Sequence, residues 1–384
     1  MIPFGKPLLG DEERSAAASV LEGTTLTHGP HVKEFEASFG EFTGAPYVVA
    51  TATCMASLHL AYLSIDLGPG DEVLVPAQTH IAMAHAVQAC GAKPVFVDAE
   101  PRTGNVDLDQ LESLVTERTR AVSVVHYLGL PVDMDRVLEI ARGHDLFVVE
   151  DCAIALGASY RDTHVGLHGD IGCFSFYPVK HITTGEGGMV ITTREDVADR
   201  VSKQRAFGID KSVLADRRHT GAYEIEYLGL NYRLGEVQAA MGVEQMKRLP
   251  GFLEARERNY DLLAEALGEV SDLQVIESGH DGDRRSSFYC LNAVLAEPLA
   301  ERREEIIDGL KQRGVGTSVY YPKALPDTRY YSETYGLGQG SCPVATSISS
   351  GSIAFPVGPH VQEDDVELMI ESVKQAIEEV AVRG

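Results

Sequence analysis

The feature that most constrains the fold is an alternation of short apolar runs with longer amphipathic runs, over about residues 45–195. Seven short runs predict β-strands at residues 47–51, 72–76, 94–98, 121–126, 146–150, 173–176 and 188–192. Several of these runs are apolar throughout, as in strands that are covered on both faces. The runs between them predict helices at residues 55–65, 81–90, 108–116 and 134–144. This β-α-β-α order predicts an α/β fold with a mostly parallel, doubly wound sheet.

The chain beyond residue 195 has a different pattern. A long helix is predicted at about residues 234–268, with an interruption at Pro250, and a closing helix with one apolar stripe at about 363–380. Between them we expect a strand at 288–293, a helix at 302–313, a short strand at 315–320 and a loop region at 314–340.

The length of 384 residues is compatible with two domains. We predict a large α/β domain over residues 26–250 and a smaller α+β domain made of residues 1–25 and 251–384. The first 25 residues are assigned to the smaller domain because they precede the first strand and carry their own amphipathic run.

The net charge of -24 argues against nucleic acid and anionic membrane surfaces as partners, although a local basic or amide-rich site can still bind a small anion. The six cysteines are scattered and the 13 histidines dispersed, so no metal site is predicted. The N-terminus does not resemble a signal peptide, and no apolar run reaches the length of a membrane span. A cytoplasmic location is therefore expected.

Three predicted strands end in residues that could bind a ligand or take part in catalysis. These ends matter because ligands of open α/β sheets bind beyond the carboxyl ends of the strands. The first strand runs into Thr53, Cys54 and Met55, which open a helix whose free amides suit a phosphate. Asp151 follows another apolar strand. The segment FSFYPVKHITTGEGGMV, residues 174–190, places Lys180 before a Gly-rich turn.

A phosphate site, a carboxylate and a desolvated lysine together suit pyridoxal phosphate (PLP). The carboxylate keeps the pyridine nitrogen protonated, and the lysine forms a Schiff base with the aldehyde. A nicotinamide-dependent oxidoreductase would need GxGxxG directly after a strand, and a nucleotide triphosphatase would need a P-loop; the sequence contains neither.

The chain resembles the DegT/DnrJ/EryC1/StrS group of sugar aminotransferases over nearly its whole length. The blocks that carry the resemblance are GPHVKEFEASFGEFTGAPYVVAT, LGPGDEVLVPAQTHIAMAHAV, KPVFVDAEP, VVEDCAIALGASY, FSFYPVKHITTGEGGMV, LGLNYRLGEVQAAMG and GVGTSVYYPKAL. The resemblance implies the aspartate-aminotransferase architecture (fold type I), with a mixed, mostly parallel seven-stranded sheet.

The resemblance also implies roles for individual residues. Lys180 falls on the lysine that forms the Schiff base, and Asp151 on the partner of the pyridine nitrogen. Ser175 falls on a hydroxyl that binds the cofactor phosphate, and His80 on the residue that stacks on the pyridine face. Asn231 falls on a phosphate-binding residue donated by the neighbouring subunit, which implies a homodimer with shared active sites.

Two positions depart from the family pattern. Ile154 stands where the family usually has a glutamine beside the ring hydroxyl of the cofactor, so that oxygen needs another group or water. Thr53-Cys54-Met55 replaces the usual Ser-Gly-Thr at the helix start, so phosphate binding there depends more on backbone amides and on Thr53.

The expected activity is transfer of an amino group from L-glutamate, or glutamine, to a nucleotide-linked keto-deoxy sugar, with the 4-keto form favoured over the 3-keto form. The alternatives are an aminotransferase for a free keto-cyclitol (an inosose) and a non-catalytic PLP-binding regulator. Family members that dehydrate sugars replace the lysine by histidine, which Lys180 argues against. The candidates for contact with substrate are Tyr127, Arg217, Arg218, Arg233, Tyr320 and Tyr321, with the loops around 208–225 and 317–340.

Overall fold

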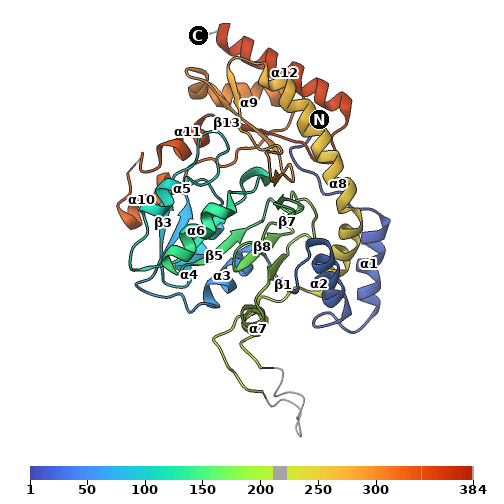
Figure 1. Cartoon of the computed structure of the whole chain (residues 1–384). Coiled ribbons are helices and arrows are strands. Elements are labelled where there is room, and N and C mark those ends of the chain that lie inside the picture. The colour runs from blue at the N-terminus through green and yellow to red at the C-terminus, as the bar shows by residue number, and fades with distance from the viewer. Residues whose placement is uncertain (211–222, 339, 383–384) are drawn as a thin grey trace.

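A computed structural model of the chain describes residues 1–210, 223–338 and 340–382. Its centre is a seven-stranded sheet in the order β1-β9-β8-β5-β4-β2-β3 (Figure 1). The strands are β1 (Tyr47–Thr51), β2 (Glu72–Pro76), β3 (Lys93–Val97), β4 (Thr119–Val125), β5 (Phe147–Asp151), β8 (Ile171–Ser175) and β9 (Gly188–Thr192). Only β9 runs against its neighbours, so the predicted mixed, mostly parallel sheet is confirmed.

Helices cover both faces of this sheet, which explains why its strands are apolar on both sides. Val73 and Val75 of β2 pack with α3 and α4 on one face, whereas Leu74 packs with α5 and α6 on the other. The helices α2 and α8 extend the second layer over β1, β8 and β9. The helices are α2 (Pro30–Thr43), α3 (Cys54–Leu63), α4 (Ile81–Ala89), α5 (Leu108–Ser113), α6 (Met134–His144), α7 (Glu195–Gln204) and α8 (Glu236–Gly268).

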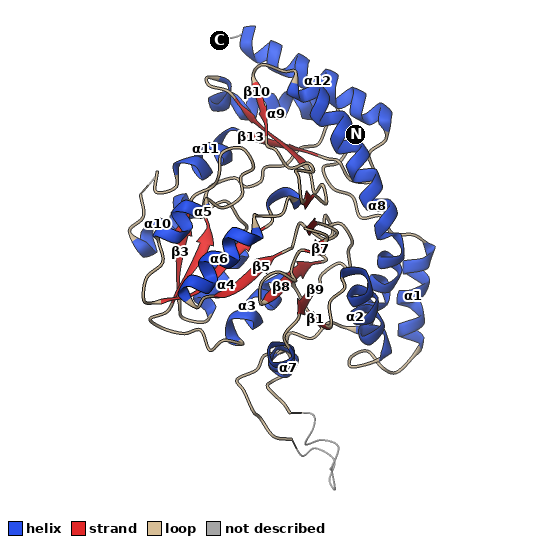
Figure 2. Cartoon of the chain, in the orientation of Figure 1, coloured by secondary structure: helices blue, strands red, loops and turns tan. Residues whose placement is uncertain are grey.

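A second, antiparallel sheet lies beside the first and has the order β10-β12-β13 (Figure 2). Its strands are β10 (Leu273–Val275), β12 (Leu291–Leu295) and β13 (Ser352–Phe355), and it packs with α9 (Arg303–Gln312) and α12 (Glu363–Val382). The predicted apolar stripe of α12 is buried there, at Val366, Met369, Val373 and Ile377.

The N-terminal residues touch both parts of the molecule. Ile2 pairs with Val315 and belongs to the core around α12. Helix α1 (Asp11–Glu22) lies along α8, where Glu13 accepts hydrogen bonds from Gln245 and Arg248. The domain boundaries themselves stay a prediction.

Three local predictions are wrong. Helix α8 continues through Pro250, because Leu249 and Phe252 are buried beside it and their packing offsets the hydrogen bond that proline cannot make. Residues 315–320 form isolated bridges of Val315 and Ser318 instead of a strand. The expected loop at 314–340 contains α10 (Arg329–Tyr335), which the burial of Tyr331 against Phe96 holds in place.

Several short elements were not predicted at all, because they lack a run long enough to show a period. They are β10, β13, β6 (Ser159–Tyr160), β7 (Thr163–His164), β11 (Arg284–Arg285), α11 (Pro343–Gly351) and three short 3-10 turns, η1 (Tyr127–Gly129), η3 (Leu299–Arg302) and η4 (Leu325–Asp327). Among the described helices, none combines the length and the apolar character that a membrane crossing needs.

The Glu150 carboxylate anchors β5 within the core. It accepts hydrogen bonds from His126 Nε2 (2.9 Å) and from the backbone N–H groups of Gly166 (2.7 Å), His168 (2.9 Å) and Gly169 (2.6 Å). The other imidazole nitrogen, Nδ1, accepts the Val132 N–H. These bonds occupy the atoms of Glu150 and His126 that could otherwise have held a metal ion with Cys152.

Removing this anchor has a calculable cost. Burial alone would raise the pKa of Glu150, but the hydrogen bond from His126 and the backbone amides keep it below its ordinary value. We expect Glu150→Ala to lower the free energy of unfolding by about 3–5 kcal/mol, because His126 and three amides lose their acceptor. Denaturant unfolding at neutral pH measures it. The exposed Glu139, which pairs with Arg136 on the surface, provides the control, and Glu139→Ala is expected to cost less than about 1 kcal/mol.

The stabilisation that Glu150 contributes to the folded state should decrease at low pH. Because the pKa of Glu150 is lower in the folded state, its stabilisation is complete above the unfolded-state value of about 4.3 and is lost as the pH falls through the folded value. The difference in stability between the wild-type protein and Glu150→Ala should therefore shrink as the pH is lowered below about 4. A difference that stays constant down to acid unfolding would contradict this account.

Candidate active site

A cavity of about 400 Å³ opens beyond the carboxyl ends of five strands of the large sheet. It brings together most of the residues singled out from the sequence: Thr53, Cys54, Met55, His80, Asp151, Ile154, Ser175, Lys180 and Tyr321. Their side chains come from segments up to about 270 residues apart in the chain, which meet because parallel strands end at one edge of the sheet.

The start of helix α3 forms one wall of the cavity. Thr53 caps the helix, since its hydroxyl accepts the Ala56 N–H at 3.0 Å. The N–H groups of Cys54 and Met55 lie in the first turn, where an α-helix offers them no partner. Gly188 passes so close that a Cβ there would lie 2.5 Å from the Thr53 backbone. This wall is therefore a close-packed cradle of amides and a hydroxyl that fits a phosphate group.

Asp151 lies at the last position of β5, on the opposite side of the strand from Glu150. Its side chain is buried and accepts the Ala153 N–H at 2.9 Å. Burial raises the pKa of this carboxyl, while the Ala153 N–H and the charge of Lys180 oppose the rise. Among the described residues, Asp151 has no ion-pair partner. A cationic ring nitrogen in the cavity would supply the missing counter-charge.

Lys180 lies on the turn after β8, where its backbone N–H donates to the Tyr177 carbonyl at 2.9 Å. Its side chain is half-buried, and its Nζ lies 5.2 Å from the centre of the Tyr289 ring. Burial lowers the pKa of Lys180, and the nearby Asp151 partly offsets this effect. The amine is therefore easier to deprotonate than an ordinary lysine, as a nucleophile requires.

The remaining walls are polar at several points. His80 caps α4, with Nδ1 accepting the Ala82 N–H at 3.2 Å, and its exposed ring borders the cavity. Ser175 ends β8 and accepts a long 3.4 Å bond from the Tyr177 N–H. Tyr177 and Glu186 also line the cavity, but the sequence did not identify them as site residues. The available signals were the position of Tyr177 close to Ser175 and that of Glu186 within the Gly-rich turn.

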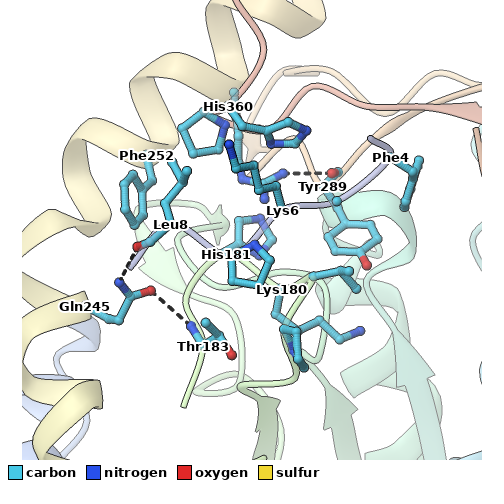
Figure 3. A pocket seen from close by; sticks show the side chains of 17 residues that line it. Phe4, Lys6, Leu8, Lys180, His181, Thr183, Gln245, Phe252, Tyr289 and His360 are labelled. Carbon is cyan, nitrogen blue, oxygen red and sulfur yellow. Dashed lines mark hydrogen bonds between the residues drawn. The ribbon is translucent and has the colours of Figure 1, made fainter. Parts of the chain in front are cut away.

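A smaller cavity of about 20 Å³ lies behind Lys180 and is lined by five basic residues, Lys6, Lys180, His181, Arg256 and His360 (Figure 3). Arg256 is buried and donates to the Phe288 and Tyr289 carbonyls at 3.3 and 2.8 Å. Burial lowers the pKa of Arg256 to about 10. Arg256 thus fixes the backbone that presents the Tyr289 ring to Lys180, a relation that no sequence pattern indicated.

Other predicted site residues lie outside the main cavity. Asn231 is exposed and its backbone bridges Ala206. Arg233 lines a separate cavity of about 110 Å³, with its guanidinium 5.0 Å from the centre of the Phe207 ring. The Tyr320 hydroxyl is hydrogen-bonded to the Tyr289 hydroxyl at 2.6 Å. Tyr127 is buried, and its hydroxyl donates a hydrogen bond to the Tyr320 carbonyl. Arg217 and Arg218 lie outside the described residues.

The sequence matches the model of the DegT/DnrJ/EryC1/StrS aminotransferase family over residues 7–374. The chain belongs to this family. It is 34% identical over 378 residues to GDP-perosamine synthase from Caulobacter vibrioides, with 98% of each chain covered. It is also 34% identical over 380 residues to the spore coat polysaccharide biosynthesis protein SpsC from Bacillus subtilis, covering 98% of this chain and 97% of that protein.

A solved structure shows the same architecture. The putative sugar aminotransferase Spr1654 from Streptococcus pneumoniae, in its PMP-form, superposes with a TM-score of 0.93 at 27% identity, covering 99% of this chain and 100% of that chain. The protein is therefore a PLP-dependent aminotransferase of fold type I. The amide cradle, the buried Asp151 without an ion-pair partner among the described residues and the lowered pKa of the Lys180 amine all fit that cofactor.

The role of Asp151 can be tested directly. When bound, the cofactor would withdraw electrons from the reacting carbon, and a protonated ring nitrogen would strengthen this effect. We expect Asp151→Asn to lower the turnover number by about 100-fold or more, equivalent to roughly 3 kcal/mol of barrier, because an amide cannot stabilise that charge. Steady-state kinetics at saturating cofactor measures it, with circular dichroism as the control for folding. A turnover number within threefold of the wild-type value would contradict this role.

Proposed function

We propose that this aminotransferase moves an amino group from L-glutamate to a nucleotide-linked keto-deoxy sugar, with a 4-keto sugar favoured over a 3-keto sugar. The observation that carries the proposal is the meeting of Lys180 and Asp151 in one cavity. Lys180 favours amino transfer over sugar dehydration, and the complete pair favours an enzyme over a non-catalytic regulator. The similarity to the GDP-perosamine synthase from Caulobacter vibrioides supports a nucleotide-linked sugar as the acceptor.

The proposed roles follow from position and protonation. The α3 start and Ser175 would hold the phosphate, Asp151 would hold the ring nitrogen, and His80 would lie against the ring. The bound cofactor supplies an electron sink. Lys180 Nζ would remove the proton from Cα of the amino donor and would deliver a proton when the acceptor sugar is aminated. Its lowered pKa favours the neutral amine that this step needs.

We also propose that the active site is shared between two subunits, with Asn231 of each chain completing the phosphate site of its partner. Asn231 is exposed and lies outside its own cavity, as a residue donated across an interface would. Exposed apolar side chains support such an interface. Met55 and Ile81 are 40% and 44% exposed near the cavity, and Leu228 is 77% exposed on a segment that extends from the body (Figure 1).

The acceptor can be identified by a half-reaction. The protein is first converted to its amine form with L-glutamate, and each candidate acceptor is then added: nucleotide-linked 4-keto and 3-keto sugars and free inososes. We expect the absorbance of the original form to return fastest, by at least about tenfold in kcat/KM, with a nucleotide-linked 4-keto sugar. Faster return with an inosose would replace the proposed acceptor. Lys180→Ala is the control and should bind cofactor without turnover.

The shared site can be tested with mixed dimers. One subunit carries Asn231→Ala and the other carries Lys180→Ala. If Asn231 serves the partner, one of the two sites receives both defects and the other is intact, so the mixed dimer should recover about half of the wild-type activity. If each Asn231 serves its own chain, both sites are defective and no activity returns. The two parent homodimers are the controls.

A further inference from the structure

The hydroxyl of Tyr321 is an uncommitted hydrogen-bonding group in the active-site cavity. Tyr321 lines that cavity together with Asp151, Ile154 and Lys180. Within the part of the chain that the structure describes, its hydroxyl has no hydrogen-bond partner. The adjacent Tyr320 differs in this respect, because its hydroxyl is bonded to that of Tyr289.

Four buried side chains fix the backbone that carries Tyr321. The Tyr320 carbonyl, one bond before Tyr321, accepts hydrogen bonds from Gln78 Nε2 at 2.9 Å and from the Tyr127 hydroxyl. Asn292 Nδ2 donates to the same Tyr127 hydroxyl at 3.2 Å, and the Ser349 hydroxyl donates to Gln78 Oε1 at 3.0 Å. We call Gln78, Tyr127, Asn292 and Ser349 the carbonyl clamp.

The carbonyl clamp joins both parts of the molecule. Gln78 and Tyr127 follow strands of the large sheet, whereas Asn292 lies on β12 and Ser349 on α11. All four side chains are at most 2% exposed. Each of the four side chains makes at least one hydrogen bond within the clamp, and breaking a buried hydrogen bond is costly, so the clamp favours one geometry. The position of the Tyr321 ring beside His80, at 6.1 Å between ring centres, is thereby set.

The cofactor presents four polar features to a site: the ring nitrogen, the phosphate, the aldehyde and the ring hydroxyl. Asp151, the amide cradle with Ser175, and Lys180 suit the first three. The apolar Ile154 offers nothing to the fourth. We propose that the Tyr321 phenol donates a hydrogen bond to the ring oxygen of the bound cofactor, which makes Tyr321 a cofactor-binding residue and not a substrate contact. This inference rests on the cofactor placement given under the proposed function.

The proposal has an electronic consequence. Burial, with the neighbouring Tyr320 and Asp151, keeps the pKa of Tyr321 well above its ordinary value, so the phenol remains a donor throughout the working pH range. Donation draws electron density from the ring oxygen. That oxygen then holds less firmly the proton that it shares with the nitrogen of Lys180 in the loaded protein. The visible absorption band of the bound cofactor should accordingly change at a lower pH than it would without the phenol.

The test compares two single-hydroxyl deletions in the loaded protein. We expect Tyr321→Phe to raise the pH midpoint of the absorbance change by about one unit, corresponding to a tenfold change in proton affinity. We expect Tyr320→Phe, which removes the adjacent hydroxyl that Tyr289 already engages, to shift the midpoint by less than about 0.3 units. The cofactor dissociation constant should rise by about five- to tenfold in Tyr321→Phe only.

A rescue variant separates this role from a purely structural one. Ile154→Gln places an amide donor in the same cavity, so the double variant Ile154→Gln/Tyr321→Phe should recover at least half of the shift. An unchanged midpoint in Tyr321→Phe with a raised KM for the sugar would overturn the inference and make Tyr321 a substrate contact. A shift in Tyr321→Phe that Ile154→Gln leaves intact would also overturn it, since the phenol would then act only through packing.

A labelling experiment distinguishes failure of the proposed cofactor placement from failure of the inference about Tyr321. Borohydride reduction of the wild-type protein followed by peptide mass spectrometry should place the cofactor on Lys180. If the label appears elsewhere, the cofactor placement fails and the role of Tyr321 fails with it. If Lys180 is labelled and Tyr321→Phe shows no shift, only the inference about Tyr321 is overturned.

Discussion

The burial of the Asp151 carboxylate at the edge of the large sheet is the constraint on which the active site depends. Desolvation disfavours its charge, and the Ala153 N–H group, the distant amine of Lys180 and His126 offset part of that cost. Burial has the corresponding effect on Lys180, because it disfavours the protonated form of the amine. A cationic heterocycle that also bonded covalently to the amine would relieve both costs at once, which fits PLP.

Much of the large sheet could be predicted from the sequence, because its strands are covered on both faces and their apolar runs are continuous. Predicted strand ends differ from the observed ones by at most two residues. The errors occur where tertiary contacts override local signals. Pro250 predicts a break in the helix from local sequence alone, yet its buried neighbours keep α8 continuous. Helix α10 forms around the buried Tyr331 in a stretch rich in turn residues.

The residues of the candidate site also differ in whether the sequence alone could predict them. Thr53, Asp151, Ser175 and Lys180 could be predicted because each follows a strand and shares an edge of the sheet. The carbonyl clamp could not, since Gln78 and Ser349 are separated by 271 residues and no local pattern links them. Ile154 was visible in the sequence as an unexplained position. The three-dimensional arrangement of Tyr321 beside it supplies an explanation that the sequence alone could not provide.

Glu150 and Asp151 are consecutive on β5 and point to opposite faces, so the strand register decides which carboxylate enters the core and which enters the cavity. A slip of one residue during folding would turn every side chain of β5 to the opposite face. A slip in one direction would place the longer glutamate at the cavity position, and a slip in the other would place the aspartate opposite His126, where it is too short to reach the amides of residues 166–169. Misregistered intermediates would thus carry an uncompensated buried charge, which disfavours them relative to the native register of the sheet.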